Sequence, residues 1–313
     1  YEVPGIGKKR VEKIRESWEK QKDIKNVMLF LQGFGMSTAF AAKIYRQYGK
    51  ESIDKVKENP YRLADDIWGI GFKTADGIAR KMGYEMNDER RLRSGLIYTL
   101  NQLADEGHCY AEEEQLIATA KQLLEADEEC IRNAMTHAIE TEDLMFDGTA
   151  IYLPPFYYAE CGTANRLNAL VQTKEVGSIF TARLDLAKLQ RETGIEYDEV
   201  QVEAIRQAIA SKVMVLTGGP GTGKTTTTKA IIAALQSAGM RILLAAPTGR
   251  AAKRMSEATG MEAKTIHRLL EYNPQDGYKR NDENPLEGDA LIVDECSMID
   301  IILMNNLTKA LPT

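Results

Sequence analysis

One short segment limits the fold of this chain more than any other feature of the sequence. Residues 218–225 read GGPGTGKT; they follow an apolar run at 213–217, and a helical pattern then continues to about Ala238. The segment fits GxxxxGK[ST], in which a strand ends in a glycine-rich loop that opens a helix. The glycines turn backbone N–H groups toward a phosphate, and the helix adds the positive end of its dipole. We therefore predict a nucleotide-binding α/β domain whose first strand is 213–217.

The loop assigns roles to its polar side chains. Lys224 is expected to reach the β- and γ-phosphates of ATP, and the hydroxyl of Thr225 to bind Mg²⁺. Gln201 opens a helix upstream, after the candidate N-cap Asp198. Its amide can pair with the edge of adenine, although a plain surface glutamine fits the pattern equally well. The predicted nucleotide-binding residues are Gln201, Gly219, Pro220, Gly221, Thr222, Gly223, Lys224, Thr225 and Thr226, with ATP and Mg²⁺ as cofactors.

A second acidic element follows further along the chain. Residues 290–293 form an apolar run that ends in Asp294 and Glu295, and another strand is expected at 241–246. Parallel strands deliver such side chains to the carboxyl edge of the sheet, where α/β proteins bind ligands. We predict that Asp294 binds Mg²⁺, together with Thr225, and that Glu295 orients and deprotonates an attacking water. Lys224 and Glu295 are thus the candidate catalytic residues.

Polar residues also follow the other elements of this region. Thr248, Gly249 and Arg250 come directly after the strand at 241–246, and Thr265 and His267 lie further on. Hydroxyls, backbone amides and arginines at strand ends suit contacts with a phosphodiester backbone. These five residues are our candidate DNA contacts, although His267 by itself is more typical of a structural residue.

The first part of the chain contains a weak internal repeat. Gly5-Ile6-Gly7, Gly33-Phe34-Gly35 and Gly69-Ile70-Gly71 are each followed at a fixed offset by Val or Ala, and then by helical periodicity. The faces expected to be buried contain Val11, Ile14 and Trp18 after the first repeat, Phe40, Ile44 and Tyr48 after the second, and Ala75, Ile78, Ala79 and Met82 after the third. A Gly-x-Gly that closes one helix and opens the next predicts a helix–turn–helix hairpin.

Three helices and a hairpin are expected next. The helices end near Gly107, Leu124 and Thr141, and Asp147-Gly148 marks a turn between short strands, which favours a winged-helix-like module. The predicted domains are 1–88 (tandem hairpins), 89–160 (winged-helix-like), 161–195 (a helix and a connecting segment) and 196–313 (an α/β P-loop domain). The predicted fold class is therefore a mainly α N-terminal region followed by a partial α/β P-loop NTPase domain.

Composition adds weaker limits. Lys and Arg number 40 against 46 Asp and Glu, so the net charge of −6 gives no sign of a nucleic-acid partner. Two basic clusters, 8–25 and the group Arg80, Lys81, Arg90, Arg91 and Arg93, are typical of solvated helix faces or of a phosphate track. The four cysteines form no CxxC pair, and no apolar run could span a membrane. We expect a cytoplasmic protein without a zinc site or disulfides.

Taken together, Gln201 and the segments GGPGTGKT, APTGRAAKR, TIHRLL and LIVDECSM resemble the RecD-like branch of superfamily 1 DNA helicases. The GxGxxxA repeats look like the tandem helix-hairpin-helix region of its long bacterial members. The resemblance implies ATP-driven 5′-to-3′ translocation on single-stranded DNA in repair or recombination, with single strands or single/double-strand junctions as partners. It also implies DNA phosphate contacts at the hairpin glycines Gly33, Gly35, Gly69 and Gly71.

The resemblance implies that 196–313 is a RecA-like motor domain that is incomplete. In members of that family, the second RecA-like domain and the arginine finger lie beyond the position of Pro312, and an OB-like region precedes that of Tyr1. We therefore expect this chain to be a fragment that binds nucleotide weakly and does not unwind DNA.

Other functions remain open. The hairpins can pack against one another or bind a protein partner, and the NTPase can act as a switch in a DNA-structure-binding module. A small-molecule kinase is the third alternative, against which Glu295 and APTGRAA argue.

Overall fold

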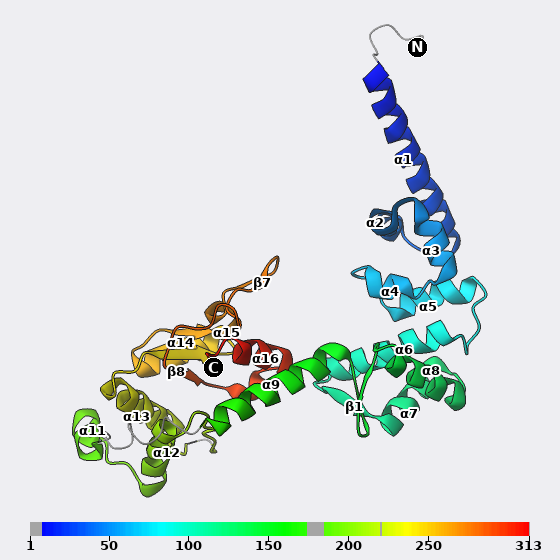
Figure 1. Cartoon of the computed structure of the whole chain (residues 1–313). Coiled ribbons are helices and arrows are strands. Elements are labelled where there is room, and N and C mark those ends of the chain that lie inside the picture. The colour runs from blue at the N-terminus through cyan, green and yellow to red at the C-terminus, as the bar shows by residue number, and fades with distance from the viewer. Residues whose placement is uncertain (1–7, 174–184, 220, 313) are drawn as a thin grey trace. The chain divides into compact units, whose positions relative to one another are not determined.

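The computed structural model describes residues 8–173, 185–219 and 221–312. The chain divides into two compact units, residues Tyr1–Pro154 and Pro155–Thr313. Figure 1 shows helices and a small sheet in the first unit, and helices around a second sheet in the other. The predicted fold class, a mainly helical region followed by an α/β P-loop domain with a parallel sheet, is confirmed. The finer domain boundaries within each unit stay predictions.

The first unit begins with helices that contain two of the glycine repeats. These elements are α1 (Lys8–Gly33), α2 (Thr38–Tyr48), η1 (Gly49–Glu51), α3 (Ser52–Glu58), α4 (Arg62–Asp66) and α5 (Phe72–Lys81). Gly35 turns the chain from α1 into α2 with a φ of 84°, and Gly69 lies between α4 and α5 with a φ of 92°. Glycine adopts this backbone region without steric cost. Both hairpins follow the prediction, and the first repeat, Gly5 to Gly7, lies outside the described residues.

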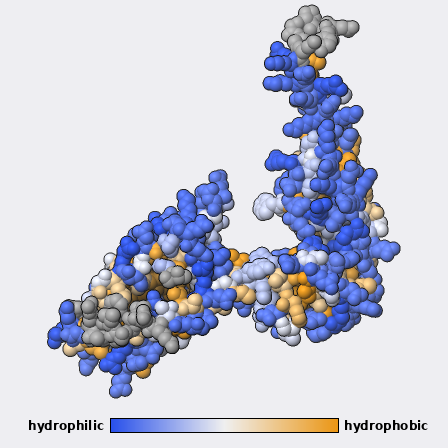
Figure 2. Space-filling model, viewed as in Figure 1, coloured by the Kyte–Doolittle hydropathy of each residue, from blue (hydrophilic) through white to orange (hydrophobic). Residues whose placement is uncertain are grey.

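The predicted packing of the first helix is wrong. Val11, Ile14 and Trp18 have exposed fractions of 36%, 52% and 68%, whereas Val27 and Leu31 further along α1 are buried. The reason is that α2 and α3 cover only the C-terminal part of the helix, where the hydrophobic core of the hairpins lies. Figure 2 shows mostly hydrophilic residues over the remainder of α1.

The rest of the first unit has the predicted winged-helix-like order. It consists of α6 (Glu89–Asp105), β1 (Tyr110–Glu112), α7 (Glu113–Leu124), α8 (Glu128–Glu140), β2 (Met145–Asp147) and β3 (Ala150–Tyr152). The strands form an antiparallel sheet in the order β1-β3-β2, with Ala111 and Phe146 both opposite Ile151. Gly148 forms the expected hairpin turn with a φ of 69°. Sequence reasoning missed β1, because a strand of three residues leaves almost no periodicity to read.

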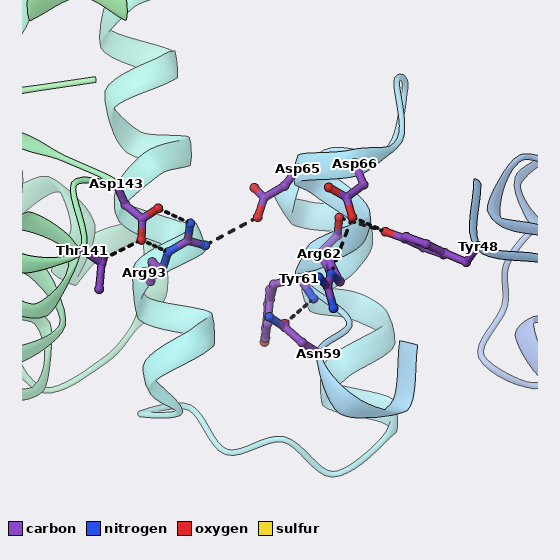
Figure 3. Close-up of polar contacts among 9 residues, drawn as sticks. All are labelled: Tyr48, Asn59, Tyr61, Arg62, Asp65, Asp66, Arg93, Thr141 and Asp143. Carbon is purple, nitrogen blue, oxygen red and sulfur yellow. Dashed lines mark hydrogen bonds and ion pairs between the residues drawn. The ribbon is translucent and has the colours of Figure 1, made fainter. Parts of the chain in front are cut away.

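Ion pairs join the hairpin helices to this module. Figure 3 shows Arg93 of α6 between Asp143 and Asp65, with nitrogen–oxygen distances of 2.5 and 3.5 Å respectively. Arg91 is buried and pairs with Asp76 of α5 at 2.8 Å. Neither interpretation of the second basic cluster therefore holds for Arg91 and Arg93: they are neither a solvated face nor a phosphate track. Their charges are neutralised inside the unit.

The second unit contains the parallel sheet. Its elements are α9 (Pro154–Gln172), α11 (Leu186–Thr193), α12 (Glu199–Ala210), α13 (Lys224–Ser237), β4 (Ile242–Ala246), α14 (Gly249–Thr259), β5 (Ala263–Thr265), α15 (Ile266–Leu269), β6 (Tyr272–Asn273), β7 (Gly277–Tyr278), β8 (Ala290–Val293), η2 (Cys296–Met298) and α16 (Ile301–Lys309). The strand order is β5-β4-β8, and β6 pairs with β7 in a separate hairpin. The strands predicted at 241–246 and 290–293 are confirmed as β4 and β8, whereas α11 falls where a connecting segment was expected.

Helices cover both faces of this sheet. Leu244 packs with Ile205 of α12 and Ala230 of α13, and its neighbour Ala245 packs with Leu303 of α16. Successive side chains of a strand point to opposite faces, so these two residues belong to separate hydrophobic clusters. The arrangement leaves the carboxyl ends of β4 and β8 free to carry polar residues.

The strand predicted at 213–217 is wrong for the described structure. This segment forms no strand among the described residues, and Val215 and Leu216 have exposed fractions of 84% and 37%. β4 pairs with β5 on one side and with β8 on the other, and in the described structure the segment pairs with neither of these outer strands. An apolar run becomes a strand only where a neighbouring strand supplies hydrogen bonds, which local sequence cannot reveal.

Candidate functional site

The glycine-rich loop has a backbone suited to enclosing a phosphate. Gly221 and Gly223 have φ values of 77° and 78°, and Gly223 is the N-cap of α13. In this left-handed conformation the loop bends sharply, and the first N–H groups of α13 have no acceptor within the helix. Thr222 Oγ1 donates to the carbonyl of Gly219 at 2.9 Å and holds the bend. Pro220 lies outside the described residues.

Lys224 lies folded against the loop. Its Nζ donates to the carbonyl oxygens of Gly218 and Gly219, the latter at 2.9 Å. No carboxylate is paired with this ammonium group within the described parts of the chain. Charged phosphate oxygens accept stronger hydrogen bonds than carbonyls, so the lysine can exchange these partners for a nucleotide. Thr225 follows in the first turn of α13 and is exposed, and Thr226 is half-buried.

Gln201 lies against this loop. Asp198 caps α12 by accepting from Gln201 N at 2.8 Å, and Gln201 Oε1 accepts from Asp198 N at 3.1 Å, which completes a capping box. A Cβ built on Gly223 would lie 2.8 Å from Gln201 Nε2. The amide NH₂ group therefore lies next to the loop, while the amide oxygen holds the helix start. The Asp-x-x-Gln spacing was the available signal for this second, structural role.

Asp294 and Glu295 follow β8 as predicted. The N–H of Asp294 donates to the carbonyl of Ala245 at 3.0 Å, extending the pairing of β8 with β4, and Asp294 Oδ1 accepts from Glu295 N at 2.9 Å. Glu295 has a φ of 55°, a left-handed conformation that costs a non-glycine residue on the order of 1–2 kcal/mol. Strain of this kind gathers at functional sites, where the surrounding structure fixes a side chain.

Sequence reasoning missed one partner of the acidic pair. Arg254 of α14 donates from Nη2 to Glu295 Oε1 at 3.1 Å, and both side chains remain accessible. The two residues are far apart in the sequence, and only the position of α14 beside β4 brings them together. Within the described residues, the hydrogen bonds of the loop and those of Asp294 and Glu295 form two separate sets.

The donor set suits Mg²⁺ held together with a nucleotide. The described residues contain no cluster of three or more His, Cys, Asp or Glu side chains that could bind a metal by themselves. Mg²⁺ is usually held by one or two protein oxygens, waters and substrate phosphates, so the oxygens of Thr225 and Asp294 are donors of the right kind, and their binding of Mg²⁺ stays a prediction. Cys296 is a free thiol, and burial raises its pKa, which makes it a poor metal ligand.

The candidate DNA contacts lie at the same sheet edge. Thr248 caps α14 by accepting from Ala251 N at 3.2 Å, and Gly249 and Arg250 are exposed in the first turn. Thr265 caps α15 in the same way, accepting from Arg268 N at 3.2 Å. A capping hydroxyl accepts with its oxygen, so its hydrogen remains for donation to a phosphate.

His267 has a different environment from the other candidates. Its ring lies 5.6 Å from that of Tyr272 and 6.1 Å from that of Tyr278, measured between centroids. The two tyrosines are 4.7 Å apart on the β6–β7 hairpin. His267 thus belongs to an aromatic cluster, consistent with the structural role that the sequence left open.

Two protein-family models match the chain. The family described as "ATP-dependent RecD2 DNA helicase HHH domain" matches residues 20–110, and the family described as "AAA domain" matches residues 201–313. The chain is 33% identical to the ATP-dependent RecD2 DNA helicase of Deinococcus radiodurans, over 99% of its own length and 45% of the relative's. The chain belongs to the RecD-like helicases.

Other relatives of this RecD-like chain match shorter parts. The RecBCD enzyme subunit RecD of Mycolicibacterium smegmatis is 35% identical over 52% of the chain and 32% of the relative. The ATP-dependent DNA helicase dda of Enterobacteria phage T4 is 45% identical over 31% of the chain and 24% of the relative. The RecD-like chain therefore spans less than half the length of these relatives.

The hairpin turns of the RecD-like chain are closed by their own hydrogen bonds. The N–H of Gly35 donates to Gln32 and that of Met36 to Leu31, at 2.9 and 3.1 Å. The N–H groups left for a phosphate therefore belong to the first turn of the following helix, and not to Gly35 itself. Gly35 and Gly69 shape the turns through their positive φ values, and the predicted DNA contacts of Gly33, Gly35, Gly69 and Gly71 remain predictions.

The two turns are held by lysines from each other's helices. Lys81 of α5 donates to the carbonyl of Phe34 at 2.8 Å, and Lys43 of α2 donates to that of Trp68 at 3.2 Å. The two hairpins of the RecD-like chain are thereby fixed against one another.

Among the helices that the structure describes, none combines the length and the apolar character that a membrane span requires.

Proposed function

We propose that this chain is part of an ATP-dependent DNA helicase that moves 5′ to 3′ along single-stranded DNA in DNA repair or recombination. The observation that carries the proposal is the glycine loop, in which the hydrogen bonds of Lys224 to described residues all go to loop carbonyls and the amide of Gln201 adjoins Gly223. The names of two relatives, "ATP-dependent RecD2 DNA helicase" and "ATP-dependent DNA helicase dda", support it. Direction and cellular role come from the family resemblance.

Residues of the glycine loop and of the acidic pair have separate roles in ATP hydrolysis. Lys224 exchanges its carbonyl partners for the β- and γ-phosphates, and Thr225 and Asp294 hold Mg²⁺, which neutralises phosphate charge when it is bound with ATP. Glu295 orients and deprotonates the attacking water. Because its Oε1 accepts from Arg254, its Oε2 is the oxygen available to that water.

Single-stranded DNA is proposed to cross the carboxyl edge of the sheet. Arg250 is exposed and has no ion pair with a described carboxylate, so its charge is available to a phosphate. The hydroxyls of Thr248 and Thr265, together with the N–H of Gly249, supply neutral donors to the backbone. His267 lies beside this path on the aromatic cluster.

ATP hydrolysis with and without single-stranded DNA tests the proposal, on a chain extended through the second motor domain. Stimulation by DNA is expected to disappear in Lys224→Ala and Glu295→Gln. Lys229→Ala is the matched control, because Lys229 is a lysine on the same helix α13, outside the glycine loop. Hydrolysis that is indifferent to DNA in the parent chain would exclude a motor.

The direction of movement along DNA and the activity of the 313-residue chain by itself need separate experiments. Partial duplexes with a 5′ or a 3′ single-stranded tail distinguish the two directions, and unwinding is expected with the 5′ tail only. The 313-residue chain itself is expected to bind a fluorescent ATP analogue weakly and to displace no strand. Robust displacement by this chain would refute the view that a second motor domain is needed.

The alternative function is a DNA-structure-binding module in which the NTPase acts as a switch. The mutual fixation of the two hairpins by Lys43 and Lys81 favours a rigid binding surface. This function predicts that ATP changes the affinity for a junction without directional movement.

A further inference from the structure

One large aromatic side chain of the hairpin region is almost fully exposed to solvent. Trp68 has an exposed fraction of 91%, and it directly precedes the Gly69 turn. A tryptophan ring is among the largest apolar surfaces in a protein, and burying it is favourable by about 1.5–3 kcal/mol or more. The fold nevertheless holds this ring in water, although the core of the same hairpins lies a few residues away.

The ring is positioned by a cation. Lys43 Nζ donates to the carbonyl of Trp68 at 3.2 Å and lies 5.3 Å from the centroid of its ring. The same Nζ lies 5.5 Å from the ring centroid of Phe40, so the ammonium group is held between two aromatic rings. A Cβ at Gly69 would lie 3.5 Å from Nζ, which is an ordinary contact, so glycine is favoured here by its φ of 92° and not by the space that the lysine needs. Lys43 fixes both the backbone of the turn and the aromatic group that it presents.

The charge around Trp68 favours an anionic occupant. No carboxylate lies within ion-pair distance of Lys43 in the described parts of the chain, and Lys73 in the first turn of α5 is exposed and likewise has no ion pair there. The acidic residues just before Trp68 are already engaged, as Figure 3 shows: Asp65 contacts Arg93 at 3.5 Å, and Asp66 accepts from the hydroxyl of Tyr48 at 2.7 Å. A flat aromatic face beside an uncompensated cation matches a nucleotide, whose base is flat and whose phosphate is negative.

The geometry points to Trp68 and Lys43 as a stacking site for one unpaired base of DNA. The indole face that Lys43 does not cover receives the base, and the ammonium group attracts the phosphate of the same strand. Stacking tolerates any base, so the site selects a single-stranded segment and not a sequence. The inference rests on the proposed function, because it takes DNA as the ligand, and it adds a contact in the hairpin unit, outside the motor domain.

Tryptophan fluorescence provides a direct test, because the chain contains only two tryptophans, Trp18 and Trp68. Trp18→Phe leaves Trp68 as the single reporter, and Trp68→Phe leaves Trp18, which is also exposed and lies on the basic part of α1. Titration of the 313-residue chain with an oligothymidine is expected to quench Trp68 strongly and Trp18 little. The matched pair separates stacking from simple proximity to DNA.

Binding by fluorescence anisotropy of a labelled oligonucleotide gives the energetic counterpart. Trp68→Ala is expected to weaken binding roughly 5- to 100-fold, as for the loss of one stacked base, and Trp68→Tyr to restore most of it. Lys43→Met is expected to weaken binding and to reduce its salt dependence. The exposed position of Trp68 means that circular dichroism of its variants should remain unchanged.

The outcomes separate this inference from the function on which it rests. DNA binding with normal affinity in Trp68→Ala, or with equal quenching of the two tryptophans, overturns the stacking site and leaves the helicase proposal intact. DNA-stimulated hydrolysis by the extended chain, without any quenching of Trp68 by the oligonucleotide, also overturns it and favours a protein partner at the hairpins. Absence of DNA binding and of stimulation in every chain overturns both.

Discussion

Replacement of Arg91 by methionine is expected to destabilise the first unit far more than the loss of a surface charge would. The guanidinium bonds to both oxygens of Asp76, at 2.8 and 3.2 Å, and Nη1 donates to the carbonyls of Met86 and Leu124 at 2.8 Å each. Tyr61 donates its hydroxyl to the same carboxylate at 2.8 Å. Burial and this hydrogen bond raise the pKa of Tyr61, so it remains a donor. One arginine thus joins α5, α6 and the end of α7.

The size of the expected loss of stability follows from the burial of the ion pair between Arg91 and Asp76. The Arg91 side chain is 3% exposed and that of Asp76 14%, so the variant leaves a largely buried carboxylate with little more than the tyrosine hydroxyl. Removing one partner of a buried ion pair costs about 3–5 kcal/mol. Domains are stable by only about 5–15 kcal/mol, so the expected loss is a large part of the stability of this unit.

Urea unfolding followed by circular dichroism measures this loss, because the first unit consists mainly of helices. Arg90→Met removes the same charge from the neighbouring position, where the guanidinium is 46% exposed, pairs with Asp88 and donates to the carbonyl of Glu58 at 2.6 Å. An exposed pair contributes at most about 1 kcal/mol, so this control should lose little. The double variant Arg91→Met with Asp76→Leu should recover much of the stability. Equal midpoints for the two single variants would refute the reasoning.

Three further predictions follow from single positions. Gly223→Ala places a methyl group in a left-handed backbone and 2.8 Å from an amide nitrogen, and a fluorescent ATP analogue should therefore bind several-fold more weakly, with circular dichroism unchanged. Gly95→Ala puts a Cβ 2.5 Å from a leucine of α7, which should lower the stability of the first unit by about 1–3 kcal/mol, whereas Gly77→Ala enters open space on α5 and should stabilise it slightly. The hydrogen bond from Arg93 lowers the pKa of Asp143, so its contribution is present above the ordinary value of 3.8 and is lost as the pH falls below it. Asp143→Asn should flatten the acid side of the stability profile, and an unchanged profile would contradict this.

Sequence reasoning succeeded where the physical cause is local. The turns at Gly35 and Gly69 need a positive φ, and the N-cap Asp198 needs only the helix that follows it. The strand β8 was placed correctly because an apolar run ending in Asp294 has few other interpretations. Each of these features depends on residues that are neighbours in the chain.

It failed where a partner far along the chain decides the outcome. The run at 213–217 is apolar, but no described strand pairs with it, and Trp18 has helical spacing without a second helix to cover it. Arg254 was overlooked because its contact with Glu295 exists only after α14 packs beside β4. Periodicity reports what a segment could bury, whereas tertiary packing decides what it does bury.

The charged residues show the same difference between what the sequence indicates and what tertiary packing decides, here for DNA binding. A net charge of −6 gives no sign of a DNA partner, and the arginine-rich start of α6 fits a solvated face or a phosphate track, but a bound phosphate responds to the local charge around it. Arg91 and Arg93 are neutralised by carboxylates, while Lys43 and Arg250 have no ion pair among the described residues. The electrostatic field of an unpaired cation extends into the solvent, where it attracts a phosphate. The field of a paired cation is largely cancelled by its carboxylate. DNA affinity should therefore respond to neutralisation of Lys43 or Arg250 and be insensitive to neutralisation of Arg90, provided that the first unit stays folded.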